Sequence, residues 1–390
     1  EIMPSLVGSE MCIRDSIQTG PFGSQLHKED YVESGTPIVT VEHLGNRVFT
    51  EQNLPRVSDC DKARLIKYTL STGDIVFSRV GSVDRCSYVD KSHDGWMFSG
   101  RCLRVRPTEL VDSLYLYYYF CLEETKQFVR NIAVGATMPS INTKLLGEVE
   151  IALPDLKNQK RIAAVLSSLD DKIENNQKLN DNLADLLQTI YQDRFGNDIL
   201  AVNQGVLSDI CSYSRDKVAV SELNVSTYFS TENMLSEKAG STEATSLPTT
   251  SQTTACHKGD TLISNIRPYF KKIVYCEGNC GCSTDVLCFT PSQPRYSTYL
   301  FSTLYADKFF AFMVAGSKGT KMPRGDKQQI MTYPVVLPSE EELAGFNTIA
   351  SPLLKQIYSN RAENKRLSIL RDTLLPKLMS GEIDVSAVQL

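Results

Sequence analysis

The sequence repeats itself, because residues 113–190 align without a gap on residues 297–374, an offset of 184 positions. The two copies share aromatic, glycine, methionine and proline residues, including Tyr115/Tyr299, Leu116/Leu300, Phe128/Phe312, Gly135/Gly319, Met138/Met322, Pro139/Pro323, Leu153/Leu337 and Pro154/Pro338. Repeats that stack into solenoids have periods of about 20–50 residues. A period of this length predicts instead a whole domain with an attached helix, present twice.

Each copy ends in a long segment with a 3.5-residue core repeat, which is the pattern of a coiled coil. The first segment, Gln159 to Phe195, contains no proline or glycine, and its core positions fall at alternating steps of 4 and 3: Ile162, Leu166, Leu169, Ile173, Asn176, Asn180, Leu183, Leu187 and Ile190. The second begins at Ser339, where Glu342 completes a capping-box pattern, and is expected to stop at Pro376.

Two asparagines stand in the middle of each seam, at Asn176 and Asn180 and at the matching Asn360 and Asn364. A seam asparagine lowers stability but fixes the register, because it requires a polar group opposite. Antiparallel pairing about the helix midpoints would place Asn176 opposite Asn364 and Asn180 opposite Asn360. A helix of about 34 residues is roughly 50 Å long, which is the length of about 15 base pairs.

The sequence before each helix indicates short strands separated by turns, followed by an aromatic-rich helix from Ser113 to about Asn131 and from Thr298. The helical spacing of Tyr115, Tyr117, Tyr118 and Tyr119 favours core packing over ligand stacking. We therefore predict an α+β fold with two similar β-rich domains, joined by two long helices that form an antiparallel coiled coil. The expected boundaries are 17–155 and 197–338 for the domains, 156–196 and 339–380 for the helices, and 381–390 for a tail.

Residues 1–16 match neither copy of the repeat. They do not begin with methionine, and they lack the basic and apolar regions of a signal peptide. We expect this segment to be non-native sequence outside the fold, and the true start of the first domain to be missing.

Eleven cysteines, odd in number and without a framework spacing, predict reduced thiols in a cytoplasmic protein. Four of them, Cys276, Cys280, Cys282 and Cys288, are close in sequence, but they lack the paired CxxC spacing of most zinc sites. A buried thiol cluster is favoured over a metal site. The longest apolar run, 114–122, is too short to span a membrane, and a net charge of −5 decides nothing about nucleic-acid binding.

Three motifs resemble those of one known family. They are Thr19-Gly-Pro-Phe-Gly-Ser-Gln-Leu26, Gly73-Asp-Ile-Val-Phe-Ser-Arg-Val-Gly81, and a block from Leu153-Pro154 through Gln159-Lys-Arg-Ile162 and Asp170-Asp-Lys-Ile173 to Asn180. With them, residues 17–390 resemble the specificity subunit of type I restriction-modification systems.

The resemblance implies that each domain is a target-recognition domain that reads one half of a split site in double-stranded DNA. The helices would set the spacer and dock two modification (methyltransferase) subunits. The resemblance also implies that this chain performs no catalysis and holds no cofactor. The modification subunits would use S-adenosylmethionine, and restriction (motor-nuclease) subunits would use ATP and Mg.

The candidate DNA contacts are polar and basic residues expected on loops, because Arg, Lys, Asn and Gln read base edges while Ser, Thr and Lys bind phosphates. They fall in the first glycine-rich loop, after a buried strand in each copy, and after each aromatic helix: Ser24, Gln25, Lys28, Ser78, Arg79, Arg85, Thr137, Lys144, Asn265, Arg267, Lys271, Lys272, Lys318, Lys321, Arg324 and Lys327.

Catalytic motifs are missing from the sequence. It contains no GxxxxGK[ST] phosphate loop or HExxH pair, and no Asn-Pro-Pro-Tyr/Phe motif of adenine methyltransferases. Pro154-Asp155 with Asp170-Asp171-Lys172 imitates a PD…DxK nuclease pattern, but the second half lies in a predicted helix. Two alternatives stay open: a nuclease or methyltransferase in its own right, and a coiled-coil scaffold whose two heads do not bind DNA.

Overall fold

The computed structural model describes residues 5–7, 16–196 and 203–388. The chain forms two compact units: unit one comprises residues 1–174 and 364–390, and unit two comprises residues 175–363. Each unit therefore contains one β-rich domain, here named its head, and one half of each long helix. The predicted α+β class is confirmed.

The head of unit one contains two four-stranded sheets. The first has the order β2-β9-β6-β7 and is antiparallel throughout, with strands Ile17–Thr19, Cys102–Val105, Ile75–Ser78 and Cys86–Tyr88. The second has the order β3-β5-β4-β8, with strands Tyr31–Val32, Arg56–Val57, Thr36–Val39 and Met97–Phe98, and its β4–β8 pair is parallel. Helix α1 (Asp59–Arg64) precedes β6, and α2 (Ser113–Cys121), α3 (Glu123–Ile132), α4 (Thr143–Leu146) and β10 (Ile151–Leu153) follow β9.

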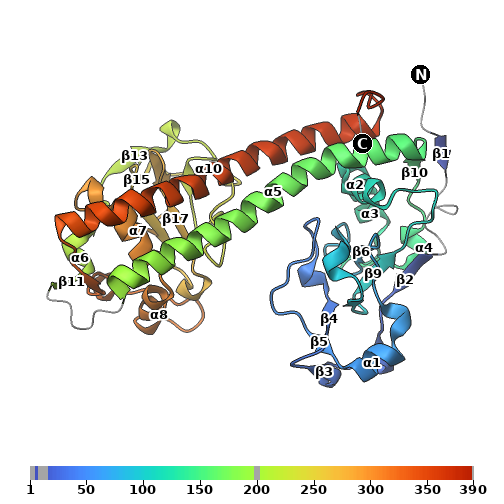
Figure 1. Cartoon of the computed structure of the whole chain (residues 1–390), viewed down its shortest axis with the longest axis horizontal. Helices are drawn as coiled ribbons and strands as arrows, with labels where there is room; N and C mark the ends of the chain where they lie inside the picture. Colours follow the sequence, from blue (N-terminus) through green and yellow to red (C-terminus); the bar gives the residue numbers. More distant parts are fainter. Residues whose placement is uncertain (1–4, 8–15, 197–202, 389–390) are drawn as a thin grey trace. The chain divides into compact units, whose positions relative to one another are not determined.

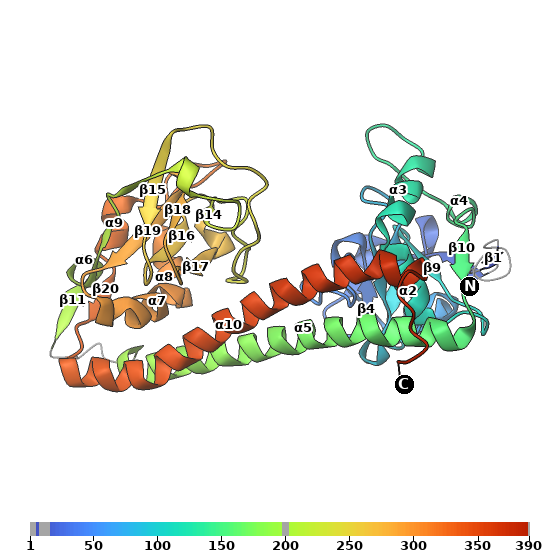
Figure 2. The ribbon, with the colours of Figure 1, turned by 90° about the horizontal axis from the view of Figure 1, so that it is seen from above.

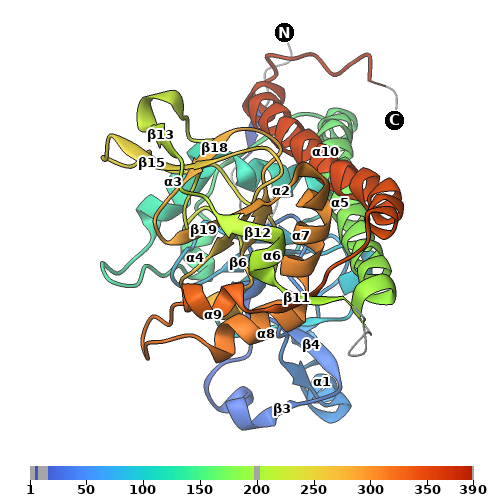
Figure 3. The ribbon, with the colours of Figure 1, turned by 90° about the vertical axis from the view of Figure 1, so that its left-hand side faces the viewer.

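The head of unit two repeats this plan (Figure 3). Its sheets have the orders β12-β19-β16-β17 and β13-β15-β18-β14. The strands are Cys211–Tyr213, Val286–Pro291, Thr261–Ser264 and Ile273–Tyr275 in the first sheet, and Lys217–Ala219, Gln252–Cys256, Cys280–Cys282 and Tyr228–Phe229 in the second. Helix α6 (Leu207–Ile210) precedes β12, while α7 (Ser297–Tyr305), α8 (Asp307–Ala315), α9 (Lys327–Met331) and β20 (Pro334–Val336) follow β19.

Part of the N-terminal segment takes part in the fold. Strand β1 (Ser5–Val7) pairs antiparallel with β10 (Figure 2), as β11 (Gln204–Val206) pairs with β20 in unit two. The expectation that residues 1–16 lie outside the fold is therefore wrong for Ser5–Val7, because β10 offers a strand edge that a short extended segment can pair with. Residues 1–4 and 8–15 lie outside the described part of the chain.

The aromatic helix, expected to be continuous from Ser113 to about Asn131, is two helices. The chain leaves the helical conformation at Leu122, where ψ is 135°, and at Ala306 of unit two, where ψ is 140°. The first helix of each pair is largely buried, whereas α3 is strongly amphipathic. A break lets each helix orient for its own environment, and Glu123 and Glu124 then stabilise the new N-terminus of α3.

The two long helices are α5 (Leu156–Tyr191), which continues as a π-helical turn to Gly196, and α10 (Glu340–Met379). In each unit they run antiparallel and side by side (Figure 1). Helix α10 does not stop at Pro376 as expected. The proline removes only one late backbone hydrogen bond, and Leu375, Leu378 and Met379 anchor the last turn in the core of unit one.

The seam asparagines partly follow the prediction. In unit two, Asn360 donates to the Oδ1 atom of Asn180 at 2.9 Å, as predicted, and Asn176 donates to Glu363 at 2.7 Å. In unit one, Asn364 donates to the carbonyl oxygen of Ile173 at 3.2 Å. The Asn176–Asn364 pair would join the two units and stays a prediction.

Each head is fixed to its own stretch of helix. In unit one, Arg47 reaches α5 with its Nε 2.8 Å from Glu174 and its Nη2 2.5 Å from Asp171. In unit two, the hydroxyl of Tyr358 on α10 accepts the backbone N–H of Tyr275 at 2.6 Å. These contacts limit rotation of a head about the helices that carry it.

The predicted thiol cluster exists in unit two and also contains Cys256, since all five cysteine side chains are buried in one core. The Sγ atoms of Cys276 and Cys280 lie 3.5 Å apart. The hydrogen bond with Cys280, together with burial, raises the pKa of Cys276. Across the described residues, no group of three or more His, Cys, Asp or Glu is arranged to hold a metal ion. Among the same residues, no helix has the length and apolarity needed to cross a membrane.

Candidate functional site

The candidate site in each unit is a pair of loops that pack together. One is the loop that follows the buried central strand, β6 or β16. The other is a hairpin between two helices: hairpin one (residues 134–140) between α3 and α4, and hairpin two (residues 318–324) between α8 and α9. The sequence placed candidate residues on both loops, and the structure brings the two loops into contact within each unit.

The backbone contacts of the loop pair are the same in the two units. Val134 and Ser140 exchange two backbone hydrogen bonds of 2.9 Å, as do Lys318 and Arg324. Gly81 donates to the carbonyl of Pro139 at 2.8 Å, and Arg267 donates to Pro323 at 2.8 Å. Ile141 donates to Arg79 at 3.0 Å, and Gly325 donates to Asn265 at 3.2 Å. Each hairpin is therefore held at both ends, and Gly135 and Gly319, with φ of 109° and 102°, begin its turn.

The side chains on this shared framework differ between the units. In unit one, Thr137 on the hairpin and Lys144 on α4 are exposed, and Arg79 donates to the carbonyl of Gly100 at 3.0 Å. Hairpin one itself carries no charge. The two loop pairs share their backbone hydrogen bonds but present different side chains, as expected if they bind two different targets of related chemistry.

Hairpin two is strongly basic. Lys318, Lys321 and Arg324 are exposed on it, and Lys327 is exposed at the start of α9. Lys318 pairs with Asp326 at 2.5 Å, which lowers the pKa of that carboxyl group, and Arg324 pairs with Asp285 at 3.0 Å. Such surface ion pairs are weak and can exchange for phosphate contacts.

Arg267 stands in a strained conformation beside hairpin two. Its φ is 50°, in the left-handed region, where the matching residue of unit one is Gly81 with φ 77°. Its buried Nε atom and the Oδ1 atom of Asn265 make no hydrogen bond within the described structure. Strained backbone and unpaired buried polar atoms are typical of functional sites.

Several predicted contacts are engaged inside the protein. Ser78 and Asn265 are buried, and the Ser78 hydroxyl donates to the carbonyl of Val80 at 2.8 Å. Both residues lie beneath the loops in this structure, and their role as direct DNA contacts stays a prediction. The others that are engaged bind neighbouring protein groups: Gln25 accepts from Tyr68, Arg85 donates to Leu44, Lys271 pairs with Asp307, and Lys272 donates to Thr231.

The first glycine-rich loop is described only in part, because the side chains of Ser24 and Lys28 lie outside the described residues. Sequence reasoning did not select Met138 and Met322, which lie exposed at the hairpin tips. Their identity in the two copies was the signal that could have found them.

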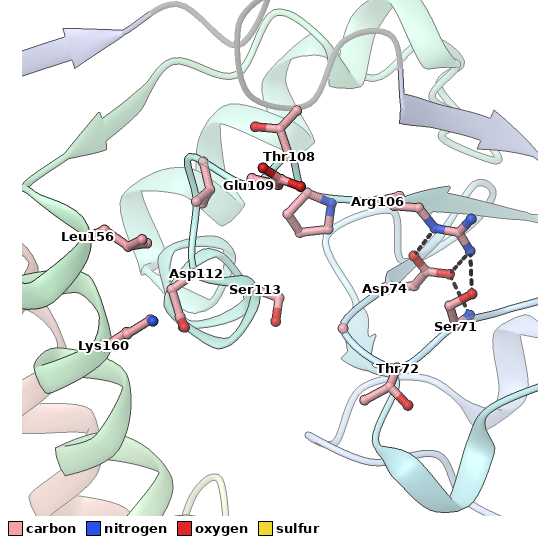
Figure 4. Close-up of a pocket in the computed structure, with 13 residues that line it drawn as sticks. Ser71, Thr72, Asp74, Arg106, Thr108, Glu109, Asp112, Ser113, Leu156 and Lys160 are labelled. Carbon is pink, nitrogen blue, oxygen red and sulfur yellow. Dashed lines mark hydrogen bonds and ion pairs between the residues drawn. The ribbon is translucent and has the colours of Figure 1, made fainter. Parts of the chain in front are cut away.

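A separate cavity of about 450 Å³ in unit one is lined by the loop before β6, the start of α2 and the start of α5 (Figure 4). The arginine of this cavity is bound to neighbouring protein groups. Arg106 makes two hydrogen bonds of 2.7 Å to Asp74 and one of 2.9 Å to Ser71. The hydrogen bond to Asp74 raises the pKa of Arg106. These groups brace the loop before β6 and leave the loop pair as the stronger candidate.

Known proteins are similar to this chain over long stretches. A model of the type I restriction modification DNA specificity domain matches residues 21–184. The type I restriction enzyme MjaIX specificity subunit of Methanocaldococcus jannaschii is 25% identical over 339 residues, which cover 72% of this chain and 71% of that protein. The HindI specificity subunit of Haemophilus influenzae is 26% identical over 158 residues, 39% of this chain and 34% of that protein.

Among solved structures, the S subunit of a type I restriction-modification system from M. genitalium has a similar fold. Its TM-score is 0.58 at 17% sequence identity, and the alignment covers 96% of this chain and 95% of that chain.

Proposed function

We propose that this chain is a type I restriction-modification specificity subunit in which each head reads one half of a bipartite, gapped DNA site. The match of the DNA specificity domain model to residues 21–184 and the similarity to the MjaIX specificity subunit support this proposal. The observation that carries the proposal is the duplicated loop pair, in which backbone contacts are shared while side chains such as Thr137 and Lys321 differ. Base edges are read by side chains on a fixed backbone, so two such heads would select two different half-sites.

In this proposal the chain is a non-catalytic subunit and the long helices set the gap. A 36-residue helix such as α5 spans about 54 Å, which is the length of about 16 base pairs. Two modification subunits would dock on the chain and methylate adenine with S-adenosylmethionine. Restriction subunits would add ATP- and Mg-dependent cleavage.

The test is a methylation map. The full chain is co-expressed with its modification subunit in a host that lacks other adenine methylation, and host DNA is sequenced for methyladenine. We expect one asymmetric motif with two defined halves and a constant gap. A stable complex that methylates nothing and binds no DNA would contradict the proposal and favour a scaffold without a DNA target.

Arg267 gives a first prediction at residue level, which concerns the half-site read by unit two. A left-handed backbone costs a non-glycine residue about 1–2 kcal/mol, whereas a glycine loses about 0.5–1 kcal/mol in chain entropy. We therefore expect Arg267→Gly to leave the melting temperature unchanged or slightly higher. Because a good arginine–base contact discriminates by about 1–3 kcal/mol, affinity for the mapped duplex should fall about tenfold or more.

The measurements are thermal unfolding and a binding titration with the mapped duplex. Arg295→Ala is the matched control. It also removes one arginine charge from unit two, but Arg295 pairs with Glu340 on α10 and is not part of the loop pair. A variant Arg267→Gly with a lower melting temperature and unchanged affinity would show that Arg267 serves the fold and not recognition.

A further inference from the structure

Each hairpin presents a methionine at its tip. Met138 is 63% exposed and Met322 is 51% exposed. Single exposed apolar residues are common on protein surfaces, so exposure alone carries no conclusion. The two residues are notable because they occupy the same position on the same framework, 184 residues apart.

The shared residues of the hairpins separate into two kinds. Gly135 and Gly319 are required by their positive φ, and the prolines contribute carbonyl groups to the bond between the two loops. The methionines have no such role, since most of each side chain lies outside the core. The flanking residues differ freely, with Thr137 and Ser140 in one hairpin against Lys321 and Arg324 in the other. A retained, exposed methionine among exchanged neighbours points to a shared ligand.

The surroundings of Met322 favour duplex DNA as the ligand, whereas hairpin one, which carries Met138, has no charge of its own. Residues 317–325 contain three basic side chains and no acidic one, and a basic rim attracts the phosphate backbone. An apolar side chain held between phosphate-binding groups meets the bases in the groove. Methionine, leucine and phenylalanine are used in this way by proteins that insert a wedge between base pairs and unstack them.

We propose that Met138 and Met322 are wedge residues, each inserting its side chain between two base pairs of the half-site that its unit reads. The inference rests on the proposed function. It adds a contact that does not depend on hydrogen bonds to bases, and it gives each half-site a preference for easily unstacked pyrimidine–purine steps such as TA and CA/TG.

The experiment uses the complex of the full chain with its modification subunits, without S-adenosylmethionine, and the duplex defined by the methylation map. 2-Aminopurine, whose fluorescence rises on unstacking, replaces each purine of the half-sites in turn. Wild type is compared with Met138→Ala, Met322→Ala and Met322→Leu. Val225→Ala is the matched control, because Val225 is a 38% exposed apolar residue of unit two that lies on neither long helix and on neither loop of the pair.

We expect one unstacked step in each half-site in addition to any target adenine flipped by the methyltransferase. Met322→Ala should abolish the signal in one half-site only, and Met138→Ala in the other. Each should weaken binding about tenfold, because the alanine lacks the apolar contact with the separated base pairs that offsets an unstacking cost of a few kcal/mol per step. Met322→Leu should retain both properties, and Val225→Ala should behave as wild type.

Three results would overturn the inference, and the measurements distinguish them. If wild type binds and methylates its motif but Met322→Ala and Met138→Ala leave affinity and fluorescence unchanged, the wedge is excluded and the recognition function stands. If the wild-type complex binds no DNA, both the wedge and the proposed recognition function are excluded. Loss of modification-subunit binding with unchanged DNA affinity would assign the methionines to a protein interface and would also overturn the wedge.

Discussion

Replacing Phe346 with alanine is expected to lower the free energy of unfolding of unit two by about 3–5 kcal/mol, the usual cost of removing a buried phenylalanine ring. Phe346 is fully buried. Its ring centroid lies 6.4 Å from that of Tyr191, 5.4 Å from Phe195 and 6.2 Å from Tyr299. These partners belong to the end of α5 and to α7, so one ring joins both long helices to the head.

The single tryptophan, Trp96, allows the two units to be followed separately. It lies in unit one, 6.4 Å from Phe49 and 4.5 Å from His93 between ring centroids. Urea unfolding of Phe346→Ala should shift the circular-dichroism transition to lower denaturant and shift the tryptophan transition much less. Ile349→Ala, on the same helix but exposed, should change stability by about 0.5 kcal/mol or less. A loss below 1 kcal/mol for Phe346→Ala would contradict the assigned packing.

The elements that sequence predicted well are those determined by local periodicity. The core positions of α5, including Ile162, Leu166, Ile173 and Leu187, are buried as the 4-3 spacing requires, because a heptad repeat specifies one face of a helix without reference to the rest of the chain. The sequence also predicted a buried strand just before the candidate loop of each copy, and β6 (Ile75–Ser78) and β16 (Thr261–Ser264) are those strands.

The elements that were missed depend on partners distant in sequence. Strand β1 pairs with a strand almost 150 residues away, and the break at Leu122 reflects different packing on its two sides. The sequence placed candidate residues on the loop after the buried strand and after the aromatic helix of each copy, and also on the first glycine-rich loop, but it could not show which of these segments contact one another. Ser78 shows why the loop residues were hard to predict. It is the last residue of β6 and is buried, and a shift of one position along the chain would place a side chain on the loop instead.

The second large effect is expected at Asp170, which is buried between α2 and α10 in unit one. It accepts hydrogen bonds from the hydroxyl of Tyr118 at 2.6 Å and from Nη1 of Arg371 at 2.7 Å. Asp170→Ala should lower the stability of unit one by about 2–3 kcal/mol, because the Tyr118 hydroxyl loses its acceptor and Arg371 loses its buried partner, while Arg371 keeps its ion pair with Asp372 at 2.8 Å. The measurement is urea unfolding of unit one, followed by the fluorescence of Trp96.

The repeat supplies the control for this prediction. At the positions that match Tyr118, Asp170 and Arg371, unit two has Ser302, Leu354 and Leu187, all buried. The same helix crossing is therefore built once with an ion pair and once with leucines. Replacing a buried ion pair by apolar residues of similar volume is often neutral or stabilising. The combination Tyr118→Phe, Asp170→Leu and Arg371→Leu should thus recover most of the stability lost in Asp170→Ala. If the triple variant is as unstable as the single one, the polar triad does more than fill space, and it must fix how α2 meets the coiled coil in unit one.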